Sequence, residues 1–209
     1  MYRPHAFAVD DVAMLHEVLR RRVFVTFAAL QDGVLRFAYA PIAVDRGAVR
    51  FHLAARNPLA SLEDGARVSL SALAVDAYVS PDWYRTVVTV PTWNYIAVEG
   101  EGAVRRLSRE ELRTLLADLS AQEEQKLAPK PPWTIDKVPP ERNEALMNAI
   151  VGFTLTFERL EGKFKLSQDK PAEDMAGVIA GLEERSDAMS VVVAGEMRRF
   201  LKTTTNGDG

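Results

Sequence analysis

The sequence predicts an α+β fold, mainly β with peripheral helices and a helical C-terminus. Short runs rich in β-branched and aromatic residues follow one another and are broken by turn signals such as Asp32-Gly33, Arg46-Gly47 and Asp64-Gly65. This spacing is typical of antiparallel, meander-like β structure. Gly100 and Gly102 interrupt the run at 94–107 and indicate a bulge or bend, which is typical of a closed or half-closed barrel.

Helical periodicity marks the remaining elements. Asp10 or Asp11 can cap a helix that contains Leu15 and Leu19, and Ser108 with Glu111 forms a capping box for a second helix. The proline-rich segment 128–140 should be irregular and exposed, with its lone Trp133 either a packing anchor or part of a lid. A short helix is expected over 141–149, followed by a half-buried strand at 152–160 and two helices over 172–202 that part near Ser186-Asp187.

Composition limits the function classes. The chain has 209 residues, 47% hydrophobic and 26% charged, with a formal net charge of -3 and no cysteine. This mildly acidic balance offers no global attraction to DNA or to anionic membranes, and the absence of cysteine excludes disulfides and thiolate sites. We found no apolar run of membrane-spanning length, no metal-ligand cluster around His5, His16 and His52, and no Walker or dinucleotide-binding turn. The expectation is a cytoplasmic protein without metal.

The stretch EGKFKLSQDK at 161–170 raises the question of an anion site. In the strand before it Phe153, Leu155 and Phe157 share one face, whereas Phe164 and Leu166 occupy the opposite phase. We therefore expect a bulge at Gly162 that turns Lys163 and Lys165 toward an anion, with Ser167 and Gln168 adding hydrogen bonds. The alternative is that both lysines are protective charges on an edge strand.

Three further polar and aromatic stretches end predicted strands, where sites tend to form. They are HLAARNP at 52–58, AYVSPDWY at 77–84 and VPTWNY at 90–95. Each has a structural alternative: Asn57 could cap a turn, Trp83 could belong to an interface, and Trp93 could be plain core. The candidate site residues from all four stretches are Arg56, Asn57, Ser80, Trp83, Thr92, Trp93, Asn94, Lys163, Lys165 and Gln168.

The resemblance rests on these motifs, on an opening motif Met1-Tyr2-x-Pro4-x-x-Phe7, and on IVGF at 150–153 and LEGKFKLSQ at 160–168. Taken together in this order, they resemble the PaiB family of FMN-binding negative transcriptional regulators. The resemblance runs from Met1 to about Gly177 and implies the FMN-binding split β-barrel shared with pyridoxamine-phosphate-oxidase-like proteins. It also implies FMN as cofactor and a homodimer with flavin at the subunit interface. The resulting domain prediction is a split-barrel domain over 1–170, a helical appendage over 171–202 and a disordered tail over 203–209.

The resemblance further assigns roles. It places Lys163, Lys165 and Arg56 near phosphate, Trp93 and Asn94 near the isoalloxazine or ribityl chain, and Ser80, Trp83, Thr92 and Gln168 as supporting contacts. Two positions depart from the family pattern: Arg56 is displaced by one residue, and Tyr39 stands two residues before Pro41, where the family tends to have histidine.

No residue stands out as an acid, base or nucleophile. A regulator, a flavin-dependent oxidoreductase or flavin reductase, and a protein that kept the fold but lost the flavin all remain open. DNA is a possible partner that the charge does not support.

Overall fold

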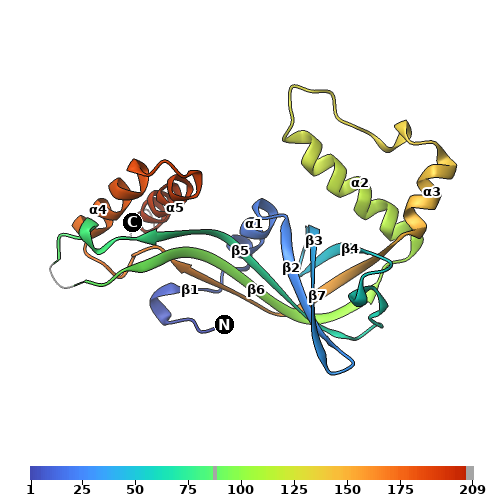
Figure 1. The fold of residues 1–209 in the computed structure, drawn as a ribbon, viewed down its shortest axis with the longest axis horizontal. Coiled ribbons are helices and arrows are strands. Elements are labelled where there is room, and N and C mark those ends of the chain that lie inside the picture. Colours follow the sequence, from blue (N-terminus) through green and yellow to red (C-terminus); the bar gives the residue numbers. More distant parts are fainter. Residues whose placement is uncertain (87–88, 206–209) are drawn as a thin grey trace. The chain divides into compact units, whose positions relative to one another are not determined.

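The computed structural model describes residues 1–86 and 89–205 of the chain. It contains an antiparallel sheet with the strand order β1-β7-β4-β3-β2-β5-β6, and β7 also pairs with β6 (Figure 1). The strands in chain order are β1 (Ala8–Val9), β2 (Phe24–Gln31), β3 (Val34–Asp45), β4 (Ala48–Ala54), β5 (Arg67–Val79), β6 (Thr92–Arg106) and β7 (Ile150–Lys165). The β6–β7 pairing closes a ring of strands, as the sequence predicted for a barrel.

The helices also follow the predicted pattern. They are α1 (Val12–Arg21), α2 (Arg109–Gln125), α3 (Pro140–Asn148), α4 (Ala172–Glu184) and α5 (Ala188–Thr205). Asp11 caps α1 through a 3.0 Å bond from Met14 N–H, and the capping box of Ser108 and Glu111 is present at α2. Helix α5 extends to Thr205, so the expected tail is helical over 203–205, and its residues 206–209 lie outside the described part of the chain.

The chain divides into two compact units. The first comprises Met1–Leu15, Leu73–Val98 and Glu161–Gly209, and the second comprises His16–Ala72 and Glu99–Leu160. Strands β5, β6 and β7 each contribute residues to both. The domain boundaries at 170 and 202 that the sequence suggested remain a prediction.

The second unit is built on the β2-β3-β4 meander. Tight turns join these strands, and Asp32 and Gly33 adopt the positive φ angles of 51° and 73° that favour this pair of residues. After β4 the meander ends, because β5 pairs with β2 and β4 pairs with β7. The core contains three buried rings: Phe27 stacks on Phe51 with centroids 3.9 Å apart, and Phe51 on Phe153 at 5.5 Å.

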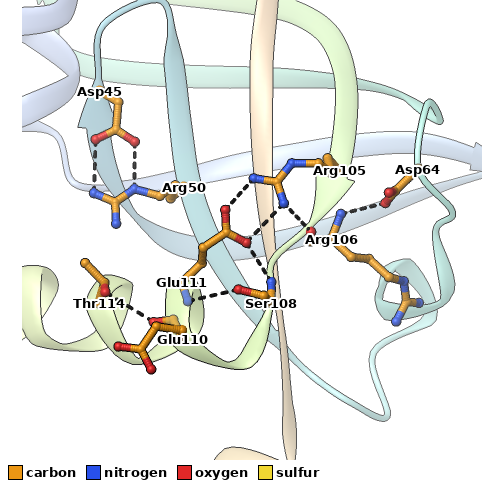
Figure 2. A network of polar contacts seen from close by, with 9 residues as sticks. All are labelled: Asp45, Arg50, Asp64, Arg105, Arg106, Ser108, Glu110, Glu111 and Thr114. Atoms are coloured by element: carbon orange, nitrogen blue, oxygen red, sulfur yellow. Dashed lines mark hydrogen bonds and ion pairs between the residues drawn. The ribbon is translucent and has the colours of Figure 1, made fainter.

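Ion pairs fasten α2 within the second unit. Figure 2 shows Arg105 of β6 paired with Glu111 of α2 at 2.7 Å. Arg50 of β4 pairs with Asp45 at 2.6 Å and also donates to Asp118 Oδ2 of α2 at 2.8 Å. The hydrogen bond from Arg105, together with those from Ser108, lowers the pKa of Glu111 to about 2. Between α2 and α3 the chain forms the exposed, irregular loop expected from its prolines (Figure 1). In this loop Trp133 is half-buried, and its backbone N–H donates to Glu124 Oε2 at 2.8 Å.

Strand β7 corrects one expectation. It continues without interruption from Ile150 to Lys165, and Gly162 pairs with Val9 in a regular ladder, so the bulge expected at Gly162 is wrong. The buried phase still inverts, from Phe153 and Leu155 in the second unit to Gly162 and Phe164 in the first. A Cβ on Gly162 would lie 2.3 Å from Leu15 Cδ2, so the glycine accommodates α1.

Candidate functional site

The first unit contains a pocket of about 350 Å³, within the range of ~300–1,000 Å³ that is typical of small-molecule sites. Its walls come from the N-terminal segment, the loop between β5 and β6, the start of β6, and the end of β7 with the residues that follow it. The described lining residues are Phe7, Tyr84, Thr89, Val90, Thr92, Lys165, Ser167, Asp169 and Lys170. This lining has two lysines, three aliphatic hydroxyl groups, two aromatic rings and a single carboxylate, so it is suited to an anion with an aromatic portion.

Lys165 is the most significant side chain of this pocket. Its Nζ donates to Thr92 Oγ1 at 2.6 Å and to the Trp93 carbonyl oxygen at 2.8 Å. Both described partners are neutral, so the ammonium is half-buried without a hydrogen-bonded carboxylate. Burial lowers the pKa of Lys165, with a smaller lowering effect from the nearby charges of Lys163 and Lys170, whereas Asp169 raises it. A desolvated ammonium with one remaining donor is well suited to bind an anion.

Lys163 points elsewhere. Its Nζ lies 5.3 Å from the ring centroid of Tyr2 and 5.4 Å from that of Tyr95, within the range of cation–π interactions. It does not line the pocket. Alternation along β7 places both lysines on the face of the strand that Phe164 does not share. Their surroundings differ because Lys163 lies near two tyrosine rings, whereas Lys165 contacts two oxygen atoms of β6.

The residues of VPTWNY divide between the two faces of β6. Trp93 is 52% exposed and meets Tyr78 edge to face, with ring centroids 6.1 Å apart. Asn94 is fully buried; its Nδ2 donates to Ser167 Oγ at 2.9 Å, and Ser167 Oγ–H in turn can donate to Asn94 Oδ1 at 3.2 Å. Thr92 lines the pocket, whereas the Asn94 amide is engaged inside the protein.

Ser167 and Gln168 fix the chain where β7 ends. Ser167 has a positive φ of 61°, a strained conformation for a residue with a Cβ. Gln168 Oε1 accepts from Leu166 N–H at 2.7 Å, and its Nε2 donates to the carbonyl oxygens of Ala6 and Phe164. Gln168 therefore ties this turn to the N-terminal segment and supports the pocket wall indirectly.

The loop between β5 and β6 holds two more candidates. Ser80 Oγ accepts from Asp82 N–H at 3.3 Å and caps a short 3₁₀ turn, Pro81–Trp83. Trp83 is half-buried against α4, where a Cβ on Gly181 would lie 2.4 Å from its indole ring. The neighbouring Tyr84 lines the pocket, although the sequence singled out Trp83.

Arg56 and Asn57 belong to the second unit. Asn57 Oδ1 accepts from Leu59 N–H at 2.9 Å, the capping role considered for it, and Arg56 is exposed. Nearby, His52 Nδ1 is buried without a hydrogen-bond partner, and burial lowers the pKa of His52. Tyr39, at the position where the family tends to have histidine, is 66% exposed.

Some pocket residues escaped the sequence reasoning. Phe7 belongs to the opening motif and Asp169 and Lys170 to EGKFKLSQDK, so the motifs contained them without identifying them. Val90 is the first residue of VPTWNY, and Thr89 had no signal other than its position beside that motif. Among the described residues no cluster of three or more His, Cys, Asp or Glu could hold a metal ion, and none of their helices has the length and apolar character to cross a membrane.

The family described as "Putative FMN-binding domain" matches residues 1–159. The chain belongs to this family. The match supports the flavin cofactor expected from the sequence, and the donor set of the pocket fits the phosphate of such a cofactor through Lys165 and the hydroxyl groups beside it. The match covers the pocket residues up to Thr92, whereas Lys165 and the other lining residues at the end of β7 lie beyond it.

Relatives support the PaiB resemblance. The Bacillus subtilis "Protease synthase and sporulation protein PAI 2" is 28% identical over 207 residues, 97% of this chain and 99% of that protein. An uncharacterised protein of Emericella nidulans is 37% identical over 119 residues, 51% of this chain and 47% of that protein. The chain thus matches about half the length of the fungal relative and nearly all of the bacterial one.

Solved structures support the split-barrel fold. A conserved hypothetical protein from Mycobacterium tuberculosis has a TM-score of 0.57 at 18% identity, covering 82% of this chain and 94% of that one. An FAD- and heme-binding protein from Mycobacterium smegmatis has a TM-score of 0.55 at 18% identity, with 81% and 78% covered. The predicted α+β split barrel is therefore confirmed.

Proposed function

We propose that this protein is a PaiB-type flavoprotein that holds FMN in the first-unit pocket, with the Lys165 ammonium at the phosphate. The single observation that carries the assignment is the half-buried, desolvated Lys165, whose described hydrogen-bond partners are the neutral oxygens of Thr92 and Trp93. A phosphate dianion would supply the missing negative charge. Bound FMN supplies redox chemistry, which the protein positions and tunes.

Other candidate residues take supporting roles in this proposal. Ser167 and Lys170 line the same pocket, Gln168 and Ser80 hold the turns around it, and Lys163 raises the local positive potential. Trp93 follows Thr92 on β6 and does not line the pocket, so the contact between its ring and the isoalloxazine stays a prediction. Arg56 and Asn57 lie in the other unit and take no part in this assignment.

The physiological role we propose is regulatory, as in the PaiB family, and cytoplasmic. The relative named for protease synthesis and sporulation, matched over nearly the whole chain, supports this choice over a flavin reductase. Because the net charge is -3, the regulator would act through a protein partner or through a local basic patch rather than by general attraction to DNA.

We also propose a homodimer that uses the exposed face of the β2-β3 hairpin. Three antiparallel pairs bring exposed and half-buried apolar side chains together on this face: Phe24 opposite the half-buried Pro41, the half-buried Ala28 opposite Phe37, and Leu30 opposite Leu35. Phe37 is 57% and Leu30 70% exposed, and apolar patches of this kind mark protein interfaces. Phe37→Glu should yield a monomer by light scattering, while Val191→Glu, at an exposed position on α5, should leave the dimer intact.

The test of the flavin assignment is direct. The purified protein should be yellow, or its melting temperature should rise with added FMN, since a ligand specific to the native state stabilises it by about 2.7 kcal/mol at 100 times Kd. Riboflavin, which lacks the phosphate, should raise it less. A colourless protein whose melting temperature ignores FMN would refute the assignment. Flavin-dependent oxidation of NADH or NADPH would favour the reductase over the regulator.

A further inference from the structure

The carboxylate of Asp174, in the first turn of α4, is buried and bound to a different part of the chain. Its Oδ1 accepts hydrogen bonds from Arg85 N–H at 2.6 Å and Thr86 N–H at 3.0 Å, and its Oδ2 accepts from Thr86 Oγ1–H at 2.6 Å. The residue is 1% exposed. Three hydrogen bonds to one carboxylate thus fix residues 85–86 of the loop between β5 and β6.

Helix α4 holds the same loop at a second place. A Cβ on Gly177 would lie 2.0 Å from the Trp83 carbonyl oxygen, and a Cβ on Gly181 would lie 2.4 Å from the Trp83 indole. Any side chain at these two positions would displace Trp83. Glycines one turn apart therefore form a groove in which Trp83 lies, next to the Asp174 contacts.

The residue between these two attachments is Tyr84, which lines the pocket. Trp83 on one side is held by the glycine groove, and Arg85 on the other side is held by Asp174. The tyrosine therefore has little freedom to leave the pocket wall while both attachments persist. Lys170, two residues before α4 begins, lines the same pocket. The start of α4 is therefore connected to the pocket twice, along the chain through Lys170 and across the fold through the Asp174 hydrogen bonds.

We propose that Asp174 is a positioning residue, which holds the Tyr84 wall of the pocket in place and thereby sets the affinity for the phosphate-bearing ligand. The proposal rests on the proposed function, because the ligand is the flavin assigned to this pocket. It gives α4 a role that the family match over residues 1–159 does not reach.

The test compares two aspartates that accept similar hydrogen bonds in the same unit. Asp174→Asn removes the negative charge and one acceptor oxygen, so the hydrogen bonds to residues 85 and 86 lose the added strength that an ionised acceptor gives them. Asp187→Asn makes the equivalent change at the start of α5, where Asp187 accepts from Ser190 N–H at 2.9 Å and from Ser190 Oγ–H at 2.8 Å. Asp174→Asn should weaken FMN binding by about tenfold or more, whereas Asp187→Asn should change the Kd less than about twofold.

Thr86→Val provides a milder, independent variant. It removes only the hydroxyl donor and keeps both backbone bonds, so it should weaken FMN binding less than Asp174→Asn. If the two side chains act as one contact, Asp174→Asn should weaken FMN binding by a smaller factor in the Thr86→Val background than in the wild type. Losses of FMN affinity that are independent in the two variants would contradict a shared positioning role.

A measurement without flavin separates this proposal from the proposed function. In the ligand-free protein, amide hydrogen exchange over residues 83–86 should be faster in Asp174→Asn and unchanged in Asp187→Asn. If exchange over 83–86 is unchanged in Asp174→Asn, the positioning role proposed for Asp174 is wrong, whether or not flavin binds. If the wild type shows no FMN binding although the exchange result holds, the proposed function is overturned and the affinity role falls with it.

Discussion

The ammonium nitrogen of Lys165, on the last residue of β7, lies 2.6 Å from the hydroxyl oxygen of Thr92, on the first residue of β6. This bond joins the two strand ends that form one side of the pocket. It also fixes the lysine before any ligand arrives, so less side-chain entropy is lost when an anion binds.

Replacing Lys165 should separate phosphate recognition from flavin recognition. Lys165→Met keeps the length of the side chain and removes the charge, so it should weaken FMN binding by about tenfold or more, the usual cost of losing a charged hydrogen bond. Riboflavin binding should change little. Lys163→Met, the matched control on the same strand, should affect FMN far less because Lys163 lies against Tyr2 and Tyr95.

Fluorescence titration with both flavins measures these affinities. Equal losses for FMN in the two lysine variants would mean that general positive charge, rather than the Lys165 contact, attracts the phosphate.

The pH dependence of FMN binding should report the Lys165 proton. Burial lowers the pKa of this ammonium from its ordinary value of 10.5 in the free protein, and a bound phosphate dianion should raise it again. Because FMN prefers the protonated form, affinity should be full below the free-protein pKa and should fall as pH rises through it. Lys165→Arg should abolish this fall, since guanidinium stays charged.

The ratio of FMN to riboflavin affinity between pH 7 and pH 10.5 is the appropriate measurement, because both ligands carry the same ring. A ratio that stays constant in the wild type would show that Lys165 does not meet the phosphate.

Turn chemistry made most of the fold predictable. Asp32-Gly33 and Arg46-Gly47 mark the hairpins of the meander, and the capping box at Ser108 marks the start of α2. The path of β7 was not predictable from periodicity, because the rule that one face of a strand stays buried fails along it. Leu155 is buried in one unit and Phe164 in the other, so an unbroken strand mimics a register slip.

The site was less predictable than the fold. Polar residue type drew attention to Asn94 and Gln168, yet both amides are engaged within the protein. Asp174 gave no signal in the sequence, because its carboxylate accepts from the backbone N–H groups of Arg85 and Thr86, which are more than eighty residues earlier in the chain. Contacts of this kind depend on tertiary structure, which no local pattern encodes.

Glu111 should contribute stability that disappears in acid. Its pKa is lowered from 4.5 to about 2 by the hydrogen bond from Arg105 and by those from Ser108. Since the folded pKa lies below the unfolded one, the contribution is complete above about pH 4.5 and is lost as pH falls toward 2. Glu111→Gln should therefore lower the melting temperature at pH 7 and much less at pH 2.5.

Glu110→Gln is the control for this change, because Glu110 lies in the same turn but its side chain is 83% exposed. Its Oε2 lies 3.7 Å from Arg113 Nη1, a longer contact than the 2.7 Å between Glu111 and Arg105. It should have little effect at either pH. A deficit in Glu111→Gln that is the same at both pH values would point to lost packing instead of lost charge.

Gly162 should resist even the smallest enlargement. An alanine Cβ there would lie 2.3 Å from Leu15 Cδ2, and Leu15 is fully buried, so its side chain has no free space to turn away. Gly162→Ala should lower the free energy of unfolding by ~1–3 kcal/mol, as overpacking usually does. Gly195→Ala, in α5 with nothing within 4 Å of the new Cβ, should be neutral or should stabilise by up to ~1 kcal/mol.

Urea denaturation of the four combinations of Gly162→Ala and Leu15→Ala identifies the cause. Leu15→Ala removes the atom that clashes, so in that background Gly162→Ala should lower the free energy of unfolding much less than it does in the wild type. If the cost of Gly162→Ala is independent of residue 15, the glycine is needed for the backbone path of β7, and the bulge rejected above would have to be reconsidered.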